Sequence, residues 1–325
     1  MKVVKQNAQY MSKKGVRPYQ FIERIGRTCY KSEDKITDTS AEKFVSNLIK
    51  REHWAMLEHW NVILEMDSHV YTQMLIDMKH PAFPNEVVGR IQITNMELKT
   101  FMSANLRVFY DLHVYPINLF ESLSMIYSAV ASEFPFVDPV DKAPFSSVHS
   151  VKIVDEERVK TFLYNYPLEL RKHITHTFLL TTDRGVSHEI VRHRLCSFAQ
   201  ESTRYCNYNK EGEIVVIEPF FFLTNGTTVS NDNFGERYGA WASSCELAEK
   251  AYNRIIADGG TPQEARTVLP NSLKTDIIVT ATEEEWQHII NLRYHGTTGA
   301  PHPQMKELMT LVYPTICEKS EGRVG

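Results

Sequence analysis

Fourteen residues near the middle of the chain, from Arg192 to Tyr205, are rich in groups that bind anions and hydrogen-bond to bases. Their sequence is RHRLCSFAQESTRY, which places three arginines and one histidine among hydroxyl, amide and carboxylate side chains. Guanidinium groups hold phosphate through planar pairs of N–H donors, and hydroxyl and amide groups can read the edge of a base. The segment therefore predicts a nucleotide-binding site.

The elements expected around these residues are a helix that leads into the segment and an extended stretch within it. Asp183 is a good N-cap for a helix that continues past Arg194, and a strand rich in Thr and aliphatic residues precedes it. On such a helix Arg192 and Arg194 would point about 200° apart, so they could engage two different anionic groups. Ser202 and Arg204 would share one side of the extended stretch. A nucleotide could then lie between the helix end and this stretch.

Other interpretations of the arginines stay open at this point. Arginines at a helix end also complement the helix dipole and can simply face water. A nucleic-acid patch is disfavoured because the formal net charge is -4 and no further basic stretch follows. A non-catalytic module that binds a nucleotide or phosphate is the main alternative from another functional class.

Metal, thiol and dinucleotide-fold chemistries find less support in the sequence. His188 and His193 flank a glutamate but are five residues apart, whereas the HExxH zinc motif needs four, so we predict no metal site. Cys196 lies near cationic residues, but a cysteine after a helix is more often a small buried hydrophobe. The sequence contains neither GxGxxG nor GxxxxGK[ST], which excludes the usual Rossmann and P-loop elements.

The remaining sequence predicts an α+β protein. Apolar residues at helical spacing indicate a helix over 38–50, and an apolar run within 53–66 suits a strand. The segment EIVVIEP at 213–219 reads as a short buried strand, and helices are expected over 238–260 and from Thr261, which caps a turn beginning with Pro262.

Composition favours a folded cytoplasmic protein. The chain has 325 residues, 42% of them hydrophobic, which is enough to bury one large core or two modest ones. Five scattered cysteines without a CxxC pair favour a reducing compartment. The N-terminal residues resemble no signal peptide, and the sequence has no apolar run of 18 or more residues, so we expect neither export nor membrane insertion.

The arginine-rich segment resembles the signature of flavin-dependent thymidylate synthases, in which RHR is followed after seven residues by Ser. Here these are Arg192, His193, Arg194 and Ser202. Four further blocks resemble that family in the same order: RTCYKS at 27–32, HWAMLEHW at 53–60, EARTVLP at 264–270 and INLRY at 290–294. The resemblance divides the chain into a family core, residues 1–69 and 166–325, and an inserted subdomain of unknown role, residues 70–165.

The resemblance implies a specific reaction and assembly. The enzyme would methylate dUMP to dTMP with FAD as cofactor, methylenetetrahydrofolate as carbon donor and NADPH as reductant, and it would release tetrahydrofolate. It would be a homotetramer with its flavin at subunit contacts, and it would bind neither nucleic acid nor membrane. The fold would be the single α/β domain typical of thymidylate-synthase-complementing proteins.

The resemblance also assigns roles to individual residues. Arg293 resembles the arginine that promotes ionisation at N3 of uracil, and Ser202 is expected at the reacting centre in a binding and orienting role. Arg266 resembles an arginine that reaches the nucleotide from another subunit. The expected dUMP contacts are Glu189, Arg192, Gln200, Glu201, Ser202, Thr203, Arg204, Arg266 and Arg293. The expected FAD contacts are His53, Glu58, Arg192, His193, Arg194, Gln200 and His288.

Three positions depart from the pattern of compact family members. Ala199 stands where an Asn is common, and Ala55 where a hydroxyl is common, so flavin contacts at these positions would differ. Glu189 replaces a neutral amide, and a carboxylate there can accept a hydrogen bond from the nucleotide sugar but would repel its phosphate.

Overall fold

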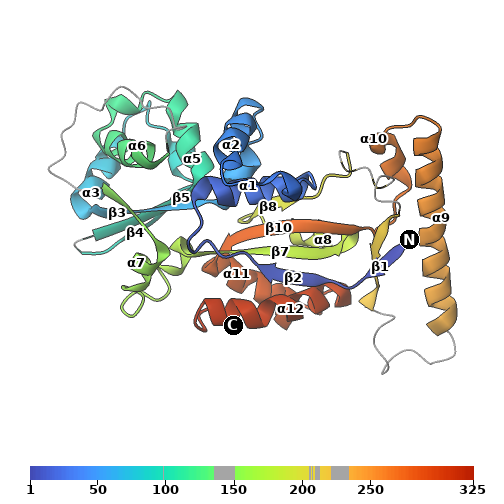
Figure 1. The fold of residues 1–325 in the computed structure, drawn as a ribbon. Coiled ribbons are helices and arrows are strands. Elements are labelled where there is room, and N and C mark those ends of the chain that lie inside the picture. Colours follow the sequence, from blue (N-terminus) through green and yellow to red (C-terminus); the bar gives the residue numbers. More distant parts are fainter. Residues whose placement is uncertain (98, 135–150, 205, 207, 209–212, 221–233) are drawn as a thin grey trace.

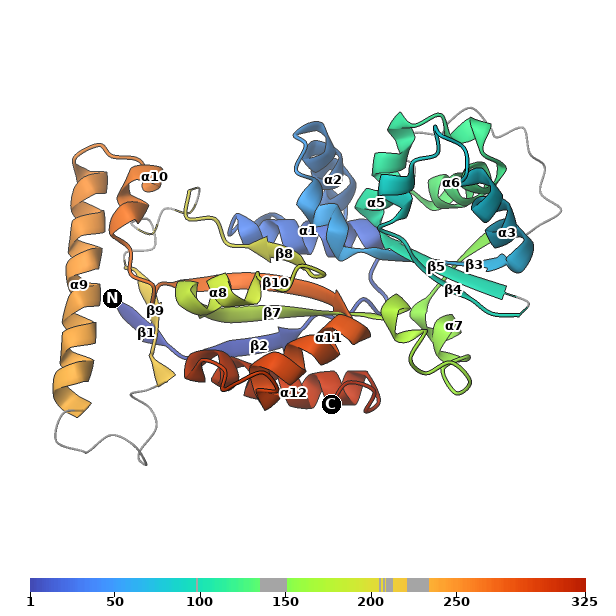
Figure 2. The ribbon, with the colours of Figure 1, turned by 180° about the vertical axis from the view of Figure 1, so that it is seen from behind.

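The computed structural model describes the whole chain except residues 98, 135–150, 205, 207, 209–212 and 221–233. Helices and strands are both abundant, as predicted for an α+β protein, and the strands among the described residues form two four-stranded sheets and one two-stranded sheet. A central sheet lies between helices, a lobe with the second sheet lies at one end, and a long helix lies at the other (Figures 1 and 2).

The central sheet has the order β2-β7-β10-β8, with all neighbouring strands antiparallel. Strand β10 pairs with β7 over its full length and with β8 on its other side. Because side chains alternate across a strand, Ile277 packs toward α11 and α12 while Ile278 packs toward α1. The strands are β2 (Asn7–Tyr10), β7 (Thr175–Asp183), β8 (Ser197–Gln200) and β10 (Lys274–Thr282), and the helices are α1 (Pro18–Cys29), α11 (Glu283–Ile290) and α12 (Pro303–Lys319).

Strand β7 continues directly into α8 (Arg184–Ile190), as predicted, and Asp183 caps that helix. Its side chain accepts the Val186 N–H at 2.6 Å. The predicted extension of this helix past Arg194 is wrong, because α8 ends at Ile190 and a turn follows. The chain must reverse there to bring β8 against β10. The predicted extended stretch is also too long, since β8 ends at Gln200 and a turn occupies Thr203 and Arg204.

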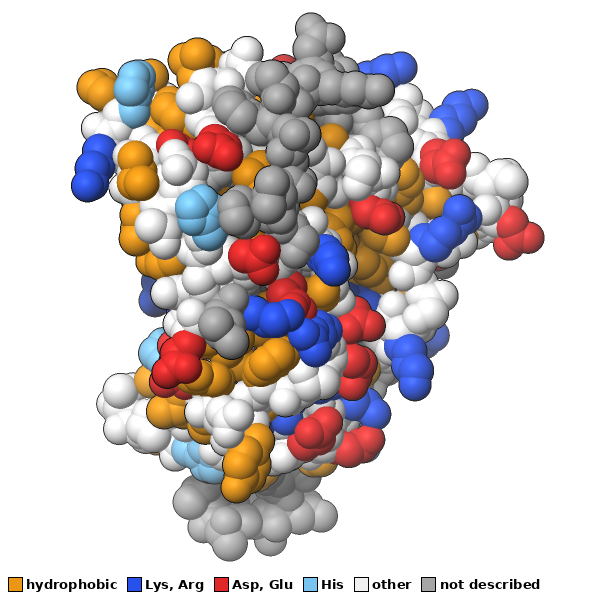
Figure 3. Space-filling model, turned by 90° about the vertical axis from the view of Figure 1, so that its left-hand side faces the viewer, with side chains coloured by type: hydrophobic (Ala, Val, Ile, Leu, Met, Phe, Trp, Pro, Cys, Tyr) orange, Lys and Arg blue, Asp and Glu red, His pale blue; other side chains and the backbone are white. Residues whose placement is uncertain are grey.

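A second sheet, of order β4-β5-β3-β6, forms the lobe at one end together with α3, α5 and α6. Its first strand in the chain, β3, lies before residue 70, in the predicted core, but it pairs with β5 and β6, which lie in the predicted insertion. The division of the chain into core and insertion stays a prediction. Charged side chains of both signs intermix over the described part of this end (Figure 3). The elements are β3 (Asn61–Asp67), α3 (Ser68–Asp77), α4 (Asn85–Val88), β4 (Gln92–Asn95), β5 (Lys99–Asn105), α5 (Leu106–Asp111), α6 (Glu121–Glu133), β6 (Val151–Val154) and α7 (Glu156–Lys160).

The opposite end of the molecule carries a long helix beside a two-stranded parallel sheet (Figure 1). The predicted strand and helices are confirmed here, and Thr261 forms a capping box with Glu264 at the start of α10. None of the helices in the described ranges is long and apolar enough to cross a membrane. The elements are β1 (Lys2–Val4), β9 (Val215–Ile217), α9 (Phe234–Ala257) and α10 (Pro262–Ala265).

The predicted helix over 38–50 is confirmed as α2 (Ser40–Lys50), which packs on α1. It buries Val45 and Leu48, although the side chain of Thr39 does not cap it. Close packing of the two helices depends on Gly26, because a Cβ at that position would lie 2.7 Å from the Phe44 ring. This pairing places the C-terminal end of α1 beside the middle of α2.

Candidate active site

Three residues that the sequence analysis singled out meet where α8 ends. Arg293 Nη1 lies 3.2 Å from Glu189 Oε2, and its Nε donates to His193 Nε2 at 3.2 Å. Its Nη2 also donates to the Glu189 carbonyl at 3.4 Å. These contacts join residues about one hundred positions apart, because β7 and β10 bring the helices that follow them to the same side of the sheet.

A buried carboxylate lies beside His193. Its Nδ1 lies 3.4 Å from Glu285 Oε1, and both side chains are buried. Since Arg293 can only donate, His193 Nε2 must accept, and the imidazole proton therefore sits on Nδ1 and faces Glu285. Glu285, His193 and Arg293 thus form a chain of contacts that holds one guanidinium in place. No local pattern in the sequence points to Glu285.

The same residues bring three possible metal ligands together. Ligand atoms of His193, Glu285 and His288 lie within 4.8 Å of one another. However, His193 Nε2 already accepts a hydrogen bond from the Arg293 guanidinium, and Nδ1 carries the proton. A metal ion would have to displace one of these hydrogens and sit beside a fixed positive charge. The cluster therefore suits hydrogen bonding better than metal binding.

Arg293 lies on a short π-helix, Asn291–His295, which extends α11. Single π-helical turns inside helices are often found at functional sites. The π-helix ends at Gly296, whose φ of 73° is in the left-handed region that favours glycine. A Cβ at Gly296 would also lie 3.0 Å from the Gly299 carbonyl oxygen. The backbone around Arg293 is therefore closely constrained.

The segment after β8 is anchored to the central sheet. Gln200 Nε2 donates to the hydroxyls of Ser187 at 2.9 Å and Thr275 at 3.2 Å. The Glu201 carboxylate is buried and contacts four groups within the chain: Lys31 Nζ and Lys274 Nζ, both at 3.3 Å, the Tyr208 hydroxyl at 2.8 Å and the Asp276 N–H at 3.4 Å. The Glu201 side chain therefore shapes the loop from inside the protein.

Ser202 and its neighbours lie next to the end of α1. The Ser202 N–H donates to the Cys29 carbonyl at 3.2 Å, and its Oγ accepts the Arg204 N–H at 3.4 Å. Ser202 and Thr203 are half-buried, whereas Arg204 is exposed. No histidine or carboxylate among the described residues hydrogen-bonds to Ser202 Oγ. This geometry suits an orienting hydroxyl and not an activated nucleophile.

The two predicted residues of the 53–60 block lie near the two ends of a 3-10 helix, Trp54–His59: His53 is its N-cap, and Glu58 is its last residue but one. His53 Nδ1 lies 3.0 Å from the Tyr30 hydroxyl. Glu58 pairs with Arg107 of α5, with 2.5 Å between Oε1 and Nη1, and its carbonyl accepts the Ser197 hydroxyl at 3.0 Å. Arg107, which no local pattern singled out, thus ties a predicted flavin-lining residue to helix α5.

The other predicted residues divide into two groups. Arg192, Arg194 and His288 are exposed close to the Arg293 cluster, and the His288 ring meets the His193 ring edge-on at 5.7 Å. In the part of the chain that the structure describes, neither Arg192 nor Arg194 pairs with a carboxylate. Arg266 is exposed on a 3-10 helix beside α9, and the structure shows no hydrogen bond from it to the cluster.

Cys196 lies beside this cluster but is poorly suited to act as a nucleophile. Burial raises the pKa of its thiol, and the nearby Glu285 carboxylate raises it further. Its Sγ lies 3.9 Å from Glu285 Oε1. Because the thiolate is the reactive form, this environment keeps the cysteine inert.

The family signature covers most of the chain. The sequence model of the family described as "Thymidylate synthase complementing protein" matches residues 13–110 and 148–319. The chain belongs to this family. The resemblance stated from the RHR block is thereby confirmed, and the match includes both the α8 end and the π-helix of Arg293. It also extends to residue 110, well into the predicted insertion.

Individual relatives align over shorter stretches. A flavin-dependent thymidylate synthase of Geobacter sulfurreducens is 32% identical over 123 residues, which are 38% of this chain and 49% of that protein. One from Pyrococcus abyssi is 30% identical over 152 residues, 45% of this chain and 59% of that protein. The chain thus spans about half the length of the relatives it matches. A solved UMP/dUMP methylase, PolB from Streptomyces cacaoi, is 20% identical with a TM-score of 0.40, covering 52% of this chain and 84% of that one.

Proposed function

We propose that this protein is a flavin-dependent thymidylate synthase. It methylates dUMP to dTMP, takes the carbon from methylenetetrahydrofolate, uses FAD as cofactor and NADPH as reductant, and releases tetrahydrofolate. Support comes from the family membership and from the Arg293 guanidinium, which is held beside the RHR segment by its contacts to Glu189 and His193. The reaction is cytoplasmic in this proposal, as composition suggested.

Arg293 would stabilise the charge that develops on the pyrimidine. Methylation at C5 of uracil requires that carbon to become nucleophilic, and negative charge then builds up on N3 and O4. A guanidinium stays protonated throughout the reaction. How strongly it stabilises the charge on N3 and O4 therefore depends on its position and orientation. The contacts to Glu189 and His193 restrict that orientation.

Glu285 and His193 would act as positioning residues for Arg293. The buried carboxylate holds the proton of His193 on Nδ1, which leaves Nε2 as the acceptor for Arg293. If His193 were protonated on both nitrogens, it would repel the guanidinium instead. The cluster therefore works only with a neutral imidazole.

The residues around the cluster suit an anionic, aromatic cofactor. Arg192 and Arg194 are exposed donors without a described carboxylate partner, and His288 presents a ring at the same place. In the proposal these residues and His193 hold FAD, together with His53, Glu58 and Gln200. FAD, when bound, supplies the electrons for the reductive step. The chain's own residues bind, orient and stabilise charge.

The predicted dUMP loop and the oligomer complete the proposed site. Ser202, Thr203 and Arg204 would surround the nucleotide, and Glu201 would hold the loop in shape from inside. Glu189 would accept a sugar hydroxyl. Because Arg266 lies on a separate part of the surface beside α9, its role requires a second subunit, which is consistent with the proposed homotetramer.

Release of tritium from C5-labelled dUMP, with NADPH and methylenetetrahydrofolate present, tests the proposal directly. We expect the wild-type protein to release tritium and Arg293→Ala to lose at least about 100-fold in kcat, the usual cost of removing a group that stabilises transition-state charge. Arg254→Ala, which removes an exposed arginine of α9 paired with Asp258, is the matched control and should behave as wild type.

The same assay distinguishes the proposed synthase from the alternative, a non-catalytic nucleotide-binding module. A protein that binds dUMP tightly but releases no tritium, with FAD bound, would be the non-catalytic nucleotide-binding module. A wild-type rate retained by Arg293→Ala would instead show that this guanidinium has no part in the reaction.

A further inference from the structure

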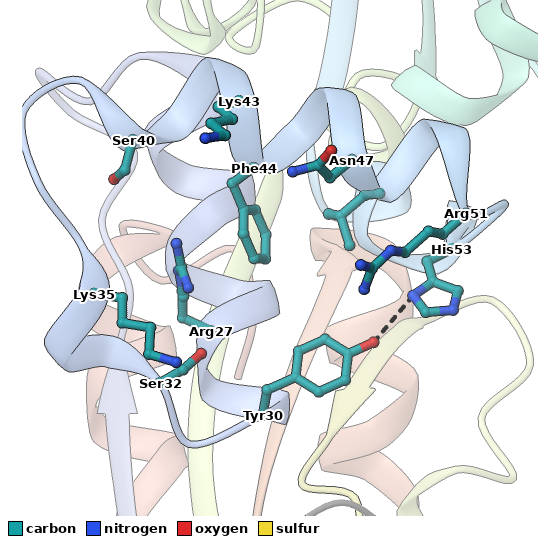
Figure 4. Close-up of a pocket in the computed structure, with 11 residues that line it drawn as sticks. Arg27, Tyr30, Ser32, Lys35, Ser40, Lys43, Phe44, Asn47, Arg51 and His53 are labelled. Carbon is teal, nitrogen blue, oxygen red and sulfur yellow. Dashed lines mark hydrogen bonds between the residues drawn. The ribbon is translucent and has the colours of Figure 1, made fainter.

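A cavity of about 500 Å³ lies between the C-terminal end of α1 and α2, and its wall includes Phe44 and Leu48 of α2. Among the described residues, its wall contains four cationic side chains, from Arg27, Lys35, Lys43 and Arg51, and no carboxylate. Figure 4 shows side chains from both helices and from the segment between them directed around this space, with the Arg51 guanidinium near the His53 ring. The other lining residues are Tyr30, Ser32, Ser40, Asn47 and His53.

Most of this positive charge is unbalanced. Arg27 pairs with Glu23 at 3.0 Å and stacks on the Phe44 ring at 4.6 Å. Lys35, Lys43 and Arg51 pair with no carboxylate in the described part of the chain. Like charges around one cavity repel, and the chain as a whole has a formal net charge of -4. A local excess of three cations in an otherwise acidic protein therefore indicates an anionic ligand.

The cavity wall includes one residue of the proposed flavin site, and the cavity adjoins the proposed dUMP loop. His53, expected to line the flavin, forms part of the cavity wall and bonds to the Tyr30 hydroxyl at 3.0 Å. Tyr30 follows Cys29, whose carbonyl accepts the N–H of Ser202 in the proposed dUMP loop at 3.2 Å. A molecule that reaches the flavin past His53 could therefore place its far end among these cations.

We propose that this basic cavity binds the multiply charged end of a co-substrate that approaches the flavin past His53. The inference rests on the proposed function. Its ligand carries at least two negative charges, which the phosphates of a nicotinamide dinucleotide or the glutamate carboxylates of a folate both supply. The cations provide attraction, and the hydroxyl of Ser32 and the amide of Asn47 provide neutral hydrogen bonds.

Two soluble probes distinguish the sources of negative charge. Adenosine 2′,5′-bisphosphate represents the phosphorylated end of NADPH, and tri-γ-glutamate represents a folate tail. Binding of each is measured by titration calorimetry on the FAD-loaded protein, so no turnover is needed. The variants are Lys43→Gln/Arg51→Gln and, as a matched control, Lys50→Gln, which removes an exposed lysine of α2 outside the cavity.

We expect the wild type and Lys50→Gln to bind one probe equally well and the double variant to bind it about tenfold more weakly. Each neutralised cation about 6 Å from a dianion should cost about threefold in affinity at physiological salt. A preference for the bisphosphate identifies the nicotinamide cofactor as the source, and a preference for tri-γ-glutamate identifies the folate.

Equal affinity of wild type and double variant for both probes, or no binding by either, would overturn the proposal. Loss of FAD from a normally folded double variant would also overturn it, because the cavity would then serve the flavin itself. Circular dichroism checks folding, and Lys35→Gln offers a second, single-site test. Titration with dUMP on the same preparations tests the proposed function separately, since probe binding without dUMP binding would refute that function alone.

Discussion

Two buried histidines should make the protein less stable in mildly acidic solution. His59 and His173 are fully buried and hydrogen-bonded to hydroxyls: Thr280 Oγ1 at 2.7 Å for His59, and Ser103 Oγ and Thr94 Oγ1, both at 2.8 Å, for His173. Burial lowers the pKa of each imidazole from 6.5 to about 3. Both residues therefore stay neutral in the folded protein at pH values where the unfolded chain is protonated.

The size of the effect follows from this difference in pKa. Between pH 6.5 and about 3 the unfolded state binds more protons, so stability rises with pH across this interval and is lost as pH falls. Going from about pH 7.5 to about pH 5.5 should cost about 1.4 kcal/mol for each histidine, or about 2.7 kcal/mol for both. This range lies above 4.5, the ordinary pKa of glutamate, so most carboxylates contribute little.

Urea unfolding at the two pH values measures this cost. The free energy of unfolding should fall by about 2.7 kcal/mol in the wild type and by about half as much in His173→Gln, whatever the stability of that variant at neutral pH. A wild-type value that changes by less than about 0.5 kcal/mol would show that the imidazoles are protonated in the folded state, and the deduced neutral, buried environment would be wrong.

Three further substitutions test the site and its support. Glu285→Gln should lower kcat about tenfold with little change in dUMP affinity, because His193 loses the carboxylate that fixes its proton; an unchanged pH profile of kcat would argue against this role. Arg323→Ala should lower the free energy of unfolding by about 3–5 kcal/mol, since it leaves the buried Glu283 carboxylate without its bidentate partner at 2.8 and 2.9 Å. Ser202→Ala should weaken turnover without abolishing it, and complete loss with FAD and dUMP still bound would point to covalent catalysis.

Local sequence patterns predicted the strands and helix starts whose residue types are typical of strands or of helix caps. The strand that ends at Asp183, its cap on α8, and the capping box at Thr261 all follow from residue types within a few positions of one another. The C-terminal end of α8 could not be predicted from neighbouring residue types. Helical spacing favoured continuation through Arg194, but pairing of β8 with the distant β10 forces the chain to turn after Ile190.

Contacts between residues distant in the sequence also limited the prediction of the candidate active site. The family resemblance selected Glu189, His193 and Arg293, and the structure brings them into contact. Glu285 and Arg107 were missed because their partners lie 92 or 49 positions away, and no local spacing relates them. Strand β10 was also missed, although its run of Ile, Val and Thr is typical of a buried strand.

The position of β10 between β7 and β8 has a consequence for synthesis of the protein. Both neighbours are made first, and each must wait for residues 274–282 before it gains its central partner. At ordinary translation speeds that delay is on the order of ten seconds, during which two apolar strand edges stay open on the nascent chain. The yield of native protein should therefore depend on how well chaperones shield the emerging polypeptide until Thr282 has left the ribosome.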